Sequence, residues 1–466
     1  MRWITKLALF ILPVTALSQS TDTLELGFRE YLGYVKKYHP VVAQANLTID
    51  MAQAAVMKAR GGFDPKVEVD YDRKIFKGTE YYDLLNATFK VPTWFGIELK
   101  ADFEQNDGQF VNPQNFVPED GLYSAGVSLN LGRFLMDDRM ATLKRAKFFR
   151  EQTRADQQLL VNEVLYRASV AYFNWLQAYR EYKVYDNILG NALQRFRAVK
   201  RSAEEGDRAI IDTVEAKIAV QNRSLSREQA RIKLLKRGLE LSNFLWMEGN
   251  IPMELQENVV PSTRIEEEID LALSIDQQPL SDFTLDTHPK LVSMQFKIDG
   301  LEIDKRLKAN RLLPSIDLNY NFLTEEPLDG NTYLSSQYKG GVRFAMPLFL
   351  RKERGDFRLA KLKLADANFE YDAVSLQLRN KITAIYNELD SFEEQNSMID
   401  EIVVNYNRML EAEERKFTFG DSSIFLVNAR EQKLIESQLK QIEIENKFLD
   451  SKARLFNTLA LPGENL

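Results

Sequence analysis

Few side chains of this protein could take part in catalysis or bind a metal, and the two histidines are the first candidates. Each stands directly before a proline, as His39-Pro40 and His288-Pro289, and there is no cysteine among the 466 residues. Imidazole nitrogens bind metals, so the two histidines could in principle form a metal pair. A residue before proline is pushed into extended backbone, however, which favours a structural turn at both positions. Because Cys-ligated zinc and cysteine nucleophiles are excluded as well, we expect neither a metal nor a cofactor.

Acidic side chains are the other candidates for chemistry. The run from Glu266 to Glu268 could bind cations, but a solvated charged surface is the plainer interpretation. Carboxylates occur throughout the sequence, and no spacing singles out a catalytic pair. The sequence also contains no Walker loop, dinucleotide fingerprint, HExxH motif or nucleophile elbow. An excess of 68 Asp and Glu over 61 Lys and Arg argues against a nucleic-acid partner. We therefore predict a protein that is not an enzyme and does not bind nucleic acid.

The N-terminus has the pattern of a secretory signal peptide. Arg2 and Lys6 give a short positive region, and an apolar run follows from Leu7 to Leu17. With Gln19 as the expected mature start, this pattern predicts a signal peptide over residues 1–18 and export from the cytoplasm. Later in the sequence, no stretch reaches the roughly 18 continuous apolar residues that a membrane-spanning helix needs.

Two sets of landmarks indicate a tandem duplication. The His-Pro pairs stand 249 positions apart, and the same offset takes Pro65 to Pro314. A second offset of 214 takes Gly206 to Gly420, each followed by Asp. Such ordered self-similarity predicts a first repeat over residues 19–251, a linker or equatorial segment with one short helix over 252–288, and a second repeat over 289–466.

Each repeat is expected to begin with a helix and to continue with strands. The helices span about residues 21–60 and 289–311, and Asp22 with Glu25 is spaced as a capping box for the first. After Pro65 and Pro314, apolar residues alternate with polar ones, which is typical of strands with one apolar face. The first run sets Val67, Val69 and Tyr71 against Glu68, Asp70 and Asp72, and the second sets Ile316, Leu318 and Tyr320 against Asp317 and Asn319.

Two sheets packed face to face would bury the charged side chains of these strands. Burying each charge would cost on the order of several kcal/mol, so a β-sandwich is disfavoured. A membrane β-barrel, with lipid outside and water inside, accommodates both faces. Four or six strands are too few for an open pore, so several chains would have to share one barrel. The alternative is a soluble one-sided sheet packed on helices.

Long helical hairpins are expected after the strands. No proline occurs from Glu119 to Ile251 or from Leu348 to Leu461. Apolar residues in these arms recur every three or four positions, which is typical of a coiled-coil seam. The glycines at 206 and 420 interrupt the arms, where they permit a left-handed turn, and the Asp after each could cap the next helix. A limb over residues 136–205 would be about 100 Å long. The seam residues are Val161, Leu165, Ala168, Tyr172, Trp175 and Tyr179 in the first arm, and Val374, Leu378, Ile382, Ile385, Leu389 and Phe392 in the second.

The ordered set of landmarks resembles the outer-membrane efflux protein family, the TolC-type channels. The resemblance covers essentially the whole mature chain, and no single motif carries it. It rests on the His-Pro pairs, on Pro65 and Pro314, on the segment Val342–Phe349 around Pro347, and on the hairpin tips at residues 206–212 and 417–424. The family implies a homotrimer in which each chain gives four strands to a twelve-stranded barrel in outer-membrane lipid. It also implies a periplasmic α-barrel that docks on an adaptor protein and an inner-membrane pump.

Three departures from the family pattern bear on the gate, the sheet and the anchor. Acids and an arginine that the second tip often carries in the family are replaced here by Ser422, Leu426 and Ala429, and Asp212 keeps the gate-type acid of the first tip. Other contacts would then hold the closed state.

The first repeat is also longer, and residues 94–107 could add a hairpin. Without cysteine, the lipid anchor of some family members is excluded. The candidate gate and adaptor-contact residues are Gly206, Asp207, Arg208, Asp212, Gly420, Asp421 and Ser422.

We therefore predict a mainly α fold in which duplicated helical hairpins form an α-barrel and strands form a transmembrane β-barrel. The predicted function is the outer-membrane channel of a tripartite efflux or secretion system in a Gram-negative-type bacterium. The channel would be a passive conduit for solutes, with its helical portion in the periplasm. The alternative is a periplasmic or surface coiled-coil scaffold without pore activity. The sequence does not identify the exported substrate or the class of pump.

Overall fold

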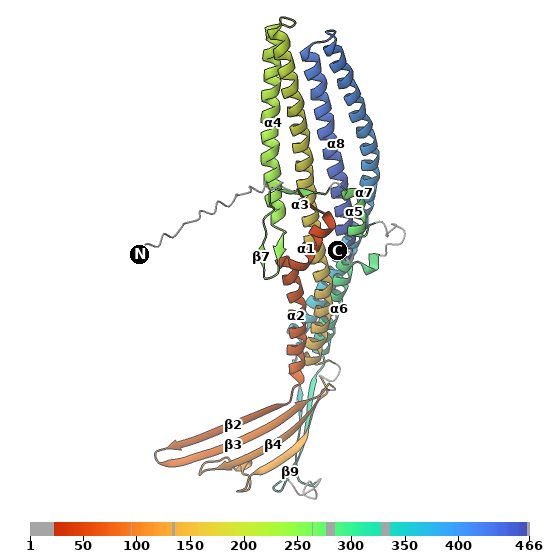
Figure 1. Cartoon of the computed structure of the whole chain (residues 1–466). Helices are drawn as coiled ribbons and strands as arrows, with labels where there is room; N and C mark the ends of the chain where they lie inside the picture. The colour runs from red at the N-terminus through yellow and green to blue at the C-terminus, as the bar shows by residue number, and fades with distance from the viewer. Residues whose placement is uncertain are drawn as a thin grey trace, which may run out of the picture.

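The molecule is elongated, with a β-sheet at one end and two helical hairpin tips at the other (Figure 1). This computed structural model describes residues 23–94, 96–132, 136–262, 264–275, 285–327 and 336–463. The expected signal peptide, residues 1–18, lies outside the described residues. In the described ranges, no helix combines the length and the apolar character needed to cross a membrane.

Four long helices build the upper half of the molecule as two hairpins. They lie side by side in the order α4, α3, α8, α7, so that α4 and α7 are the outer members of the row (Figure 1). With 67 residues, α3 is about 100 Å long, as predicted from the proline-free arm. The predicted seam of this arm is confirmed, since Leu165, Ala168, Tyr172 and Trp175 are all buried. The four helices are α3 (Asp138–Glu204), α4 (Ile210–Ser242), α7 (Arg351–Thr418) and α8 (Ile424–Leu459).

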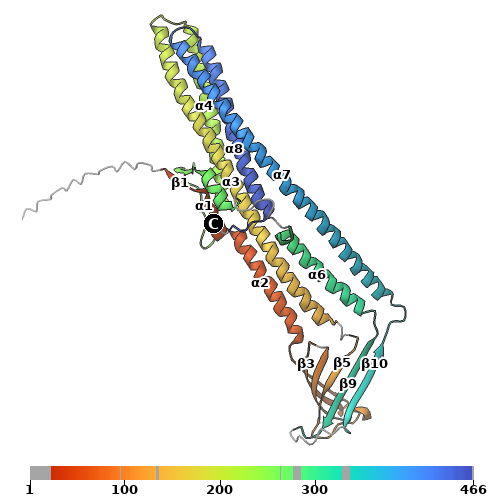
Figure 2. The ribbon, with the colours of Figure 1, turned by 90° about the vertical axis from the view of Figure 1, so that its right-hand side faces the viewer.

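Two shorter helices, α2 (Pro40–Arg60) and α6 (Pro289–Asn310), complete the lower half in the order α2, α3, α6, α7 (Figure 2). The His-Pro pairs start these helices. Nδ1 of His39 accepts a hydrogen bond from the Val41 amide at 3.2 Å, and Nδ1 of His288 accepts one from the Lys290 amide at 3.1 Å. Both histidines are therefore N-caps, which confirms the structural turn role. Within the described part of the chain, no group of three metal-type ligands occurs.

The segment before α2 differs from the single helix expected over residues 21–60. Residues Leu24–Leu26 form strand β1, which pairs in parallel with β8 (Val259–Pro261), and helix α1 (Phe28–Tyr38) ends at His39. The expected capping box was wrong, because Glu25 lies in β1; Asp22 is outside the described residues. The N-terminus of α1 is satisfied instead by Glu268, whose Oε2 accepts from the Phe28 amide at 3.0 Å. One residue of the acidic run is thus a capping group.

An aromatic core fills the middle of the molecule, between α1, α3, α5 and the end of α8. Helix α5 (Ile265–Leu273) is the one short helix expected between the repeats. The Phe28 ring lies 5.2 Å from Phe173 and 5.3 Å from Tyr172, measured between ring centres. The Tyr172 hydroxyl donates to the Leu26 carbonyl at 2.7 Å and accepts from the Ser262 amide at 3.1 Å. These contacts join α1, β1 and the segment between the repeats to α3. Short elements here are β6 (Trp246–Met247), β7 (Ile251–Pro252) and a 3₁₀ turn (Leu285–Thr287).

The sheet has six strands in the order β10, β9, β5, β4, β3, β2, and every neighbouring pair is antiparallel. Four strands lie in residues 66–130 and two in residues 315–345. The family resemblance implied four strands per chain, so that expectation is corrected to six in the described ranges. The additional hairpin lies in the longer segment that the sequence offered for it. The strands are β2 (Lys66–Phe76), β3 (Thr79–Pro92), β4 (Ile97–Asp107), β5 (Leu122–Asn130), β9 (Ser315–Thr324) and β10 (Tyr338–Ala345). Short 3₁₀ turns (Gly61–Phe63 and Pro113–Asn115) precede β2 and β5.

Candidate functional site

The register of the sheet gives it one apolar and one polar face. Residues that pair across strands lie on the same face, and adjacent rows alternate between faces. One row, read from β2 to β10, is Val67, Phe89, Ala101, Ala125, Phe322 and Tyr338. The adjacent row on the other face is Lys66, Lys90, Lys100, Gly126, Asn321 and Lys339. The alternation seen in the sequence therefore runs across all six strands.

In the described ranges, the apolar face of the sheet packs against no other element. Val67 is 71% exposed and Val342 is 75% exposed, and no helix covers the sheet (Figure 1). Since exposed apolar area of this extent marks a membrane or protein contact, the soluble sheet packed on helices is not what the chain forms. The outward face suits lipid.

The polar face carries both signs of charge. Lys90 pairs with Glu68, Lys100 lies 3.8 Å from Glu98, and the amino group of Lys339 lies 3.4 Å from Glu104. The aspartates at 70, 72 and 317 share this face with the lysines. The polar face is therefore of mixed charge and not uniformly acidic.

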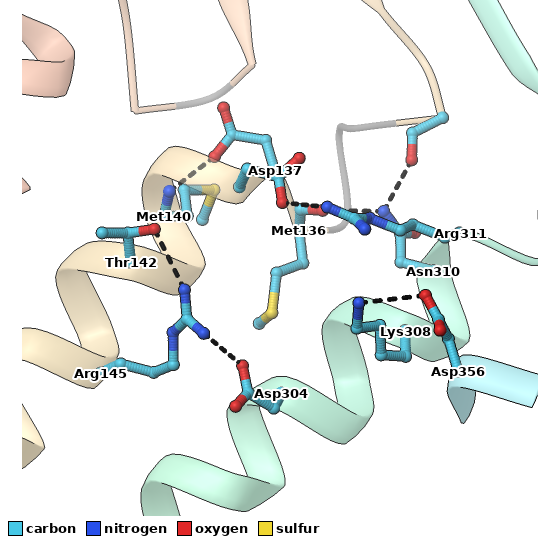
Figure 3. Close-up of polar contacts among 12 residues, drawn as sticks. Met136, Asp137, Met140, Thr142, Arg145, Asp304, Lys308, Asn310, Arg311 and Asp356 are labelled. Atoms are coloured by element: carbon cyan, nitrogen blue, oxygen red, sulfur yellow. Dashed lines mark hydrogen bonds and ion pairs between the residues drawn. The ribbon is translucent and has the colours of Figure 1, made fainter. Parts of the chain in front are cut away.

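A network of polar contacts fixes the sheet to the helices (Figure 3). Asp137 caps α3 by accepting from the Met140 amide at 2.6 Å. The Asn310 amide group, at the end of α6, donates to the carbonyls of Gly132 and Met136 at 2.7 and 2.8 Å. These bonds tie the end of α6 to both ends of the connection between β5 and α3.

Two ion pairs extend this junction. Arg145 of α3 reaches Asp304 of α6 at 2.6 Å, and Lys308 of α6 reaches Asp356 of α7 at 3.2 Å (Figure 3). Helices α3, α6 and α7 are thus linked to one another beside the sheet. The sequence analysis did not identify this junction. A signal was present, because Asp137 and Asp138 precede a long segment with helical spacing of apolar residues, and aspartate is typical of a helix start.

The proline landmarks lie at the same boundary. Strands β2 and β9 begin directly after Pro65 and Pro314. Pro347 lies between the end of β10 at Ala345 and the start of α7 at Arg351. Proline has no amide hydrogen to donate to a β-sheet or to the interior of a helix. Each of these prolines therefore lies at a boundary between a helix or turn and a strand.

The two hairpin tips have the same backbone turn. Gly206 has φ +87° and Gly420 has φ +86°, so both use the left-handed region that the sequence predicted. The amides of Asp207 and Asp421 donate to the carbonyls of Ser202 and Lys416, each at 2.9 Å. The predicted capping by these aspartates was wrong. The following helices begin later, with N-cap residues Ala209 and Ser423, and the Ser423 hydroxyl accepts from Leu426 at 3.3 Å.

One residue of the first tip holds the second. The Arg208 guanidinium donates from Nη2 to the Phe417 carbonyl at 2.8 Å and stacks 3.8 Å from the centre of the Phe417 ring. Ser422 donates to Glu413 on its own hairpin at 2.5 Å. Within the described part of the chain, the carboxylates of Asp207, Asp212 and Asp421 make no ion pair or side-chain hydrogen bond. These three carboxylates are therefore available to another molecule.

A buried charge network braces the two hairpins below the tips. Glu431 of α8 is 1% exposed. Its carboxylate lies 3.0 Å from Arg195 of α3 and 3.4 Å from Arg223 of α4. Arg195 also reaches Glu414 of α7 at 2.8 Å, so the network touches all four long helices. Sequence reasoning missed this brace, because no local pattern pairs residues more than 200 positions apart.

A family model described as Outer membrane efflux protein matches residues 35–245 and 280–461. The chain belongs to this family. No curated protein matches it.

Solved structures agree with the fold of this outer membrane efflux protein. The Campylobacter jejuni CmeC outer membrane channel is 13% identical with a TM-score of 0.64, over 93% of this chain and 85% of that one. The outer membrane protein VceC of Vibrio cholerae is 10% identical with a TM-score of 0.64, over 94% and 97%. The open state of the Neisseria gonorrhoeae MtrE outer membrane channel is 11% identical with a TM-score of 0.64, over 95% and 92%. At these identities, the likeness is one of fold.

The family gives the function in general terms. The protein is an outer-membrane channel of a tripartite efflux system, located in the outer membrane of a Gram-negative-type bacterium with its helical portion in the periplasm. Channels of this family work with an adaptor and an inner-membrane pump. The family and the fold are those of channels and not of enzymes. This assignment favours the channel over the scaffold without pore activity.

Proposed function

We propose that three copies of this chain form one continuous tube, a passive conduit from the periplasmic adaptor to the exterior, without covalent chemistry of its own. The observation that carries the proposal is that the helices or strands at each level of the molecule form a single row. The two outer members of each row have a neighbour on one side only. The rows are α4 to α7 in the upper half, α2 to α7 in the lower half, and β2 to β10 in the sheet. In each row one end belongs to the first repeat and the other to the second, so identical copies can join head to tail.

Exposed apolar stripes on the outer helices support this assembly. Helix α4 exposes apolar residues at steps of three, four and seven, and the lower part of α7 exposes them at steps of three and seven. This is the spacing of a coiled-coil seam that needs a partner helix. Contact between α4 or α2 of one copy and α7 of the next would cover both stripes. The residues are Ile211, Val214, Ile218, Leu225, Ile232, Leu235 and Leu239 on α4, and Leu359, Leu362, Phe369 and Leu376 on α7.

The proposed division of the chain follows the same rows. The first repeat, residues 19–251, supplies one end of every row, and the second, residues 289–466, supplies the other. Residues 252–288 would form the equatorial segment around the tube, after removal of the signal peptide over 1–18. The parallel roles of His39 and His288 as N-caps, and of Pro65 and Pro314 before strands, support the duplication.

The hairpin tips are the proposed gate and adaptor contact. Gly206 and Gly420 shape the turns, Arg208 ties the two tips of one copy together, and Ser422 is held within its own hairpin. Asp207, Asp212 and Asp421 would face neighbouring copies or the adaptor. Closure by these residues would replace the acids and the arginine that the second tip often carries in the family.

Membrane fractionation and an efflux assay together test the proposal. The full-length protein should sediment with outer membranes, resist extraction by salt, and run as an oligomer that heating dissociates. Expressed with its adaptor and pump in a bacterium lacking its own channel, it should restore resistance to at least one exported compound. Release by salt without detergent, as a monomer, would support a scaffold and would overturn the channel proposal.

A further inference from the structure

We infer that the barrel of this channel has eighteen strands, closed by a specific pairing of β10 of one copy with β2 of the next. The inference rests on the proposed trimer and concerns how its sheet closes. Three sheets of six strands give eighteen, a number at which barrels enclose an open aqueous lumen. The partner of each open edge is a second copy of this chain.

The two edge strands of the sheet, β2 and β10, have no partner strand on their outer sides in the described ranges. Their directions allow them to pair with each other between copies. Every residue of β2 and of β10 is exposed. With an even number of antiparallel strands, β2 and β10 run in opposite directions, so the two edges can pair as antiparallel strands. Edge strands with free backbone groups are not found in lipid, because each unpaired group costs on the order of several kcal/mol there.

The pairing of β5 with β9 inside the chain provides the register. This is the place where the first repeat meets the second, and β10 with β2 of the next copy is where the second meets the first. By sequence, β9 corresponds to β2, with Leu318 matching Val69. Strand β5 corresponds to β10, because Tyr123, Val127 and Leu129 align with Tyr338, Val342 and Phe344.

Transfer of this register predicts the contacts between copies. Within the chain, Leu129 pairs with Leu318 and Val127 pairs with Tyr320. The corresponding pairs between copies are Phe344 with Val69 and Val342 with Tyr71, all apolar residues on the lipid-facing side. The apolar and polar faces thus continue across the boundary between copies.

The same register brings opposite charges together on the polar face. Arg343, between Val342 and Phe344, lies opposite Asp70 of the next copy. Among the residues that the structure describes, neither side chain has an ion pair or hydrogen-bond partner. Asp317, directly across from Arg343 in β9, instead accepts from Asn130. An arginine on one edge and an aspartate on the other are therefore complementary at the predicted position.

Cysteine cross-linking in this naturally cysteine-free chain tests both closure and register. Directly opposed residues have Cα atoms about 4.5–5.5 Å apart, within disulfide range, whereas diagonal neighbours lie about 7–8 Å apart. The full-length variant Val69→Cys/Phe344→Cys, oxidised in outer membranes, should form covalent ladders that end at three copies. The diagonal control Val69→Cys/Val342→Cys should cross-link about tenfold less, and single-cysteine variants should form at most a minor dimer.

Each other outcome contradicts a defined part of the inference. Preferential cross-linking of the diagonal pair would overturn the register. A ladder that ends at two copies would overturn eighteen strands in favour of twelve. An intact, efflux-competent trimer without any cross-link would overturn the pairing of β10 with β2 while leaving the proposed function standing, and loss of the oligomer from wild-type membranes would overturn both.

Charge reversal provides a second measurement that does not depend on disulfide chemistry. Asp70→Arg should lower the temperature at which the oligomer dissociates in detergent, and adding Arg343→Glu should restore it. Asp72→Arg is the matched control on the same strand and face, and Arg343→Glu should not rescue it, because Asp72 lies opposite Gly341 in this register. Equal rescue of both variants, or of neither, would contradict the pairing of Arg343 with Asp70.

Discussion

Arg208 and Phe417 join the two hairpin tips, with a hydrogen bond of 2.8 Å to the Phe417 carbonyl and the guanidinium 3.8 Å from the ring centre. Arginine over an aromatic face combines electrostatic attraction with packing. This contact links the first and second tips of one copy, beside a cluster in which Ile424 packs with Val199 and Ala216. A change in the spacing of the tips would alter this pair.

Replacing Arg208 should loosen the tips. We expect Arg208→Ala to remove a hydrogen bond and a cation–π contact worth about 1–2 kcal/mol together, and to increase leakage through the channel. Single-channel conductance of the purified protein in planar bilayers is the measurement. Lys200→Ala is the control, because Lys200 is exposed and its only ion pair in the described region is a weak one with Glu204 at 3.8 Å. Conductance unchanged from wild type would remove Arg208 from the gate.

Asp212 is the acid of the first tip that the sequence singled out. It lies in the first turn of α4. If this carboxylate helps to hold the closed state between copies, Asp212→Ala should raise conductance, and Asp212→Glu should stay near wild type. Asp212→Ala channels with wild-type conductance would count against a gating role. The effect should shrink at high salt, since exposed charge interactions are screened.

Glu431 should be the most sensitive position of the helical brace. Glu431→Gln leaves Arg195 and Arg223 without their shared carboxylate, and removing one partner of a buried pair costs about 3 kcal/mol or more. The retained contact of Arg195 with Glu414 should soften this loss. Thermal unfolding in detergent should show a lowered Tm. Glu436→Gln, on the exposed surface of the same helix, is the control and should leave the Tm unchanged within about a degree.

Acid should destabilise the caps formed by the histidines. Burial lowers the pKa of His288 below its usual value, with Lys290 acting in the same direction and the bond to the Thr458 carbonyl opposing it. Burial, together with Arg167, also lowers the pKa of His39. The unfolded chain therefore binds protons more readily than the folded one, so stability falls as the pH drops below about 6.5 and levels off below the folded pKa values.

Asparagine at both positions separates this titration from capping. His39→Asn/His288→Asn retains a side-chain acceptor for each helix start but removes the titrating group. We expect the Tm of the wild type to fall between about pH 7 and pH 5 and that of the variant to fall less. Parallel curves for the two proteins would show that other groups cause the acid sensitivity.

The long elements were predictable because their signals are local. An uninterrupted three–four spacing without proline defined α3 and α7, and period-two alternation after Pro65 and Pro314 located the first strand of each repeat. The His-Pro pairs were interpreted correctly because the residue before proline is restricted and proline suits the first helical turn.

The parts that were missed depend on contacts distant in sequence. Strand β1 has three residues, too few for a periodic signal, and it exists because β8 pairs with it. The cap of α1 comes from Glu268, 240 positions away. The brace around Glu431 depends on which residues each of the four long helices turns toward the others. At the tips, Asp207 and Asp421 were predicted to be caps, but each helix begins three residues later, at Ile210 and Ile424.

Helices α3 and α7 run without a break from the junction beside the sheet to the tips, whereas α4 and α8 stop near the aromatic core. If either continuous helix tilts about that core, its far end must move with it as a rigid arm. A small rotation there becomes a large lateral displacement at the far periplasmic end, about 1 Å for each degree over a 60 Å arm of 40 residues. A small movement caused by a docked partner could thus open the channel widely at the hairpin tips, without any helix having to unfold.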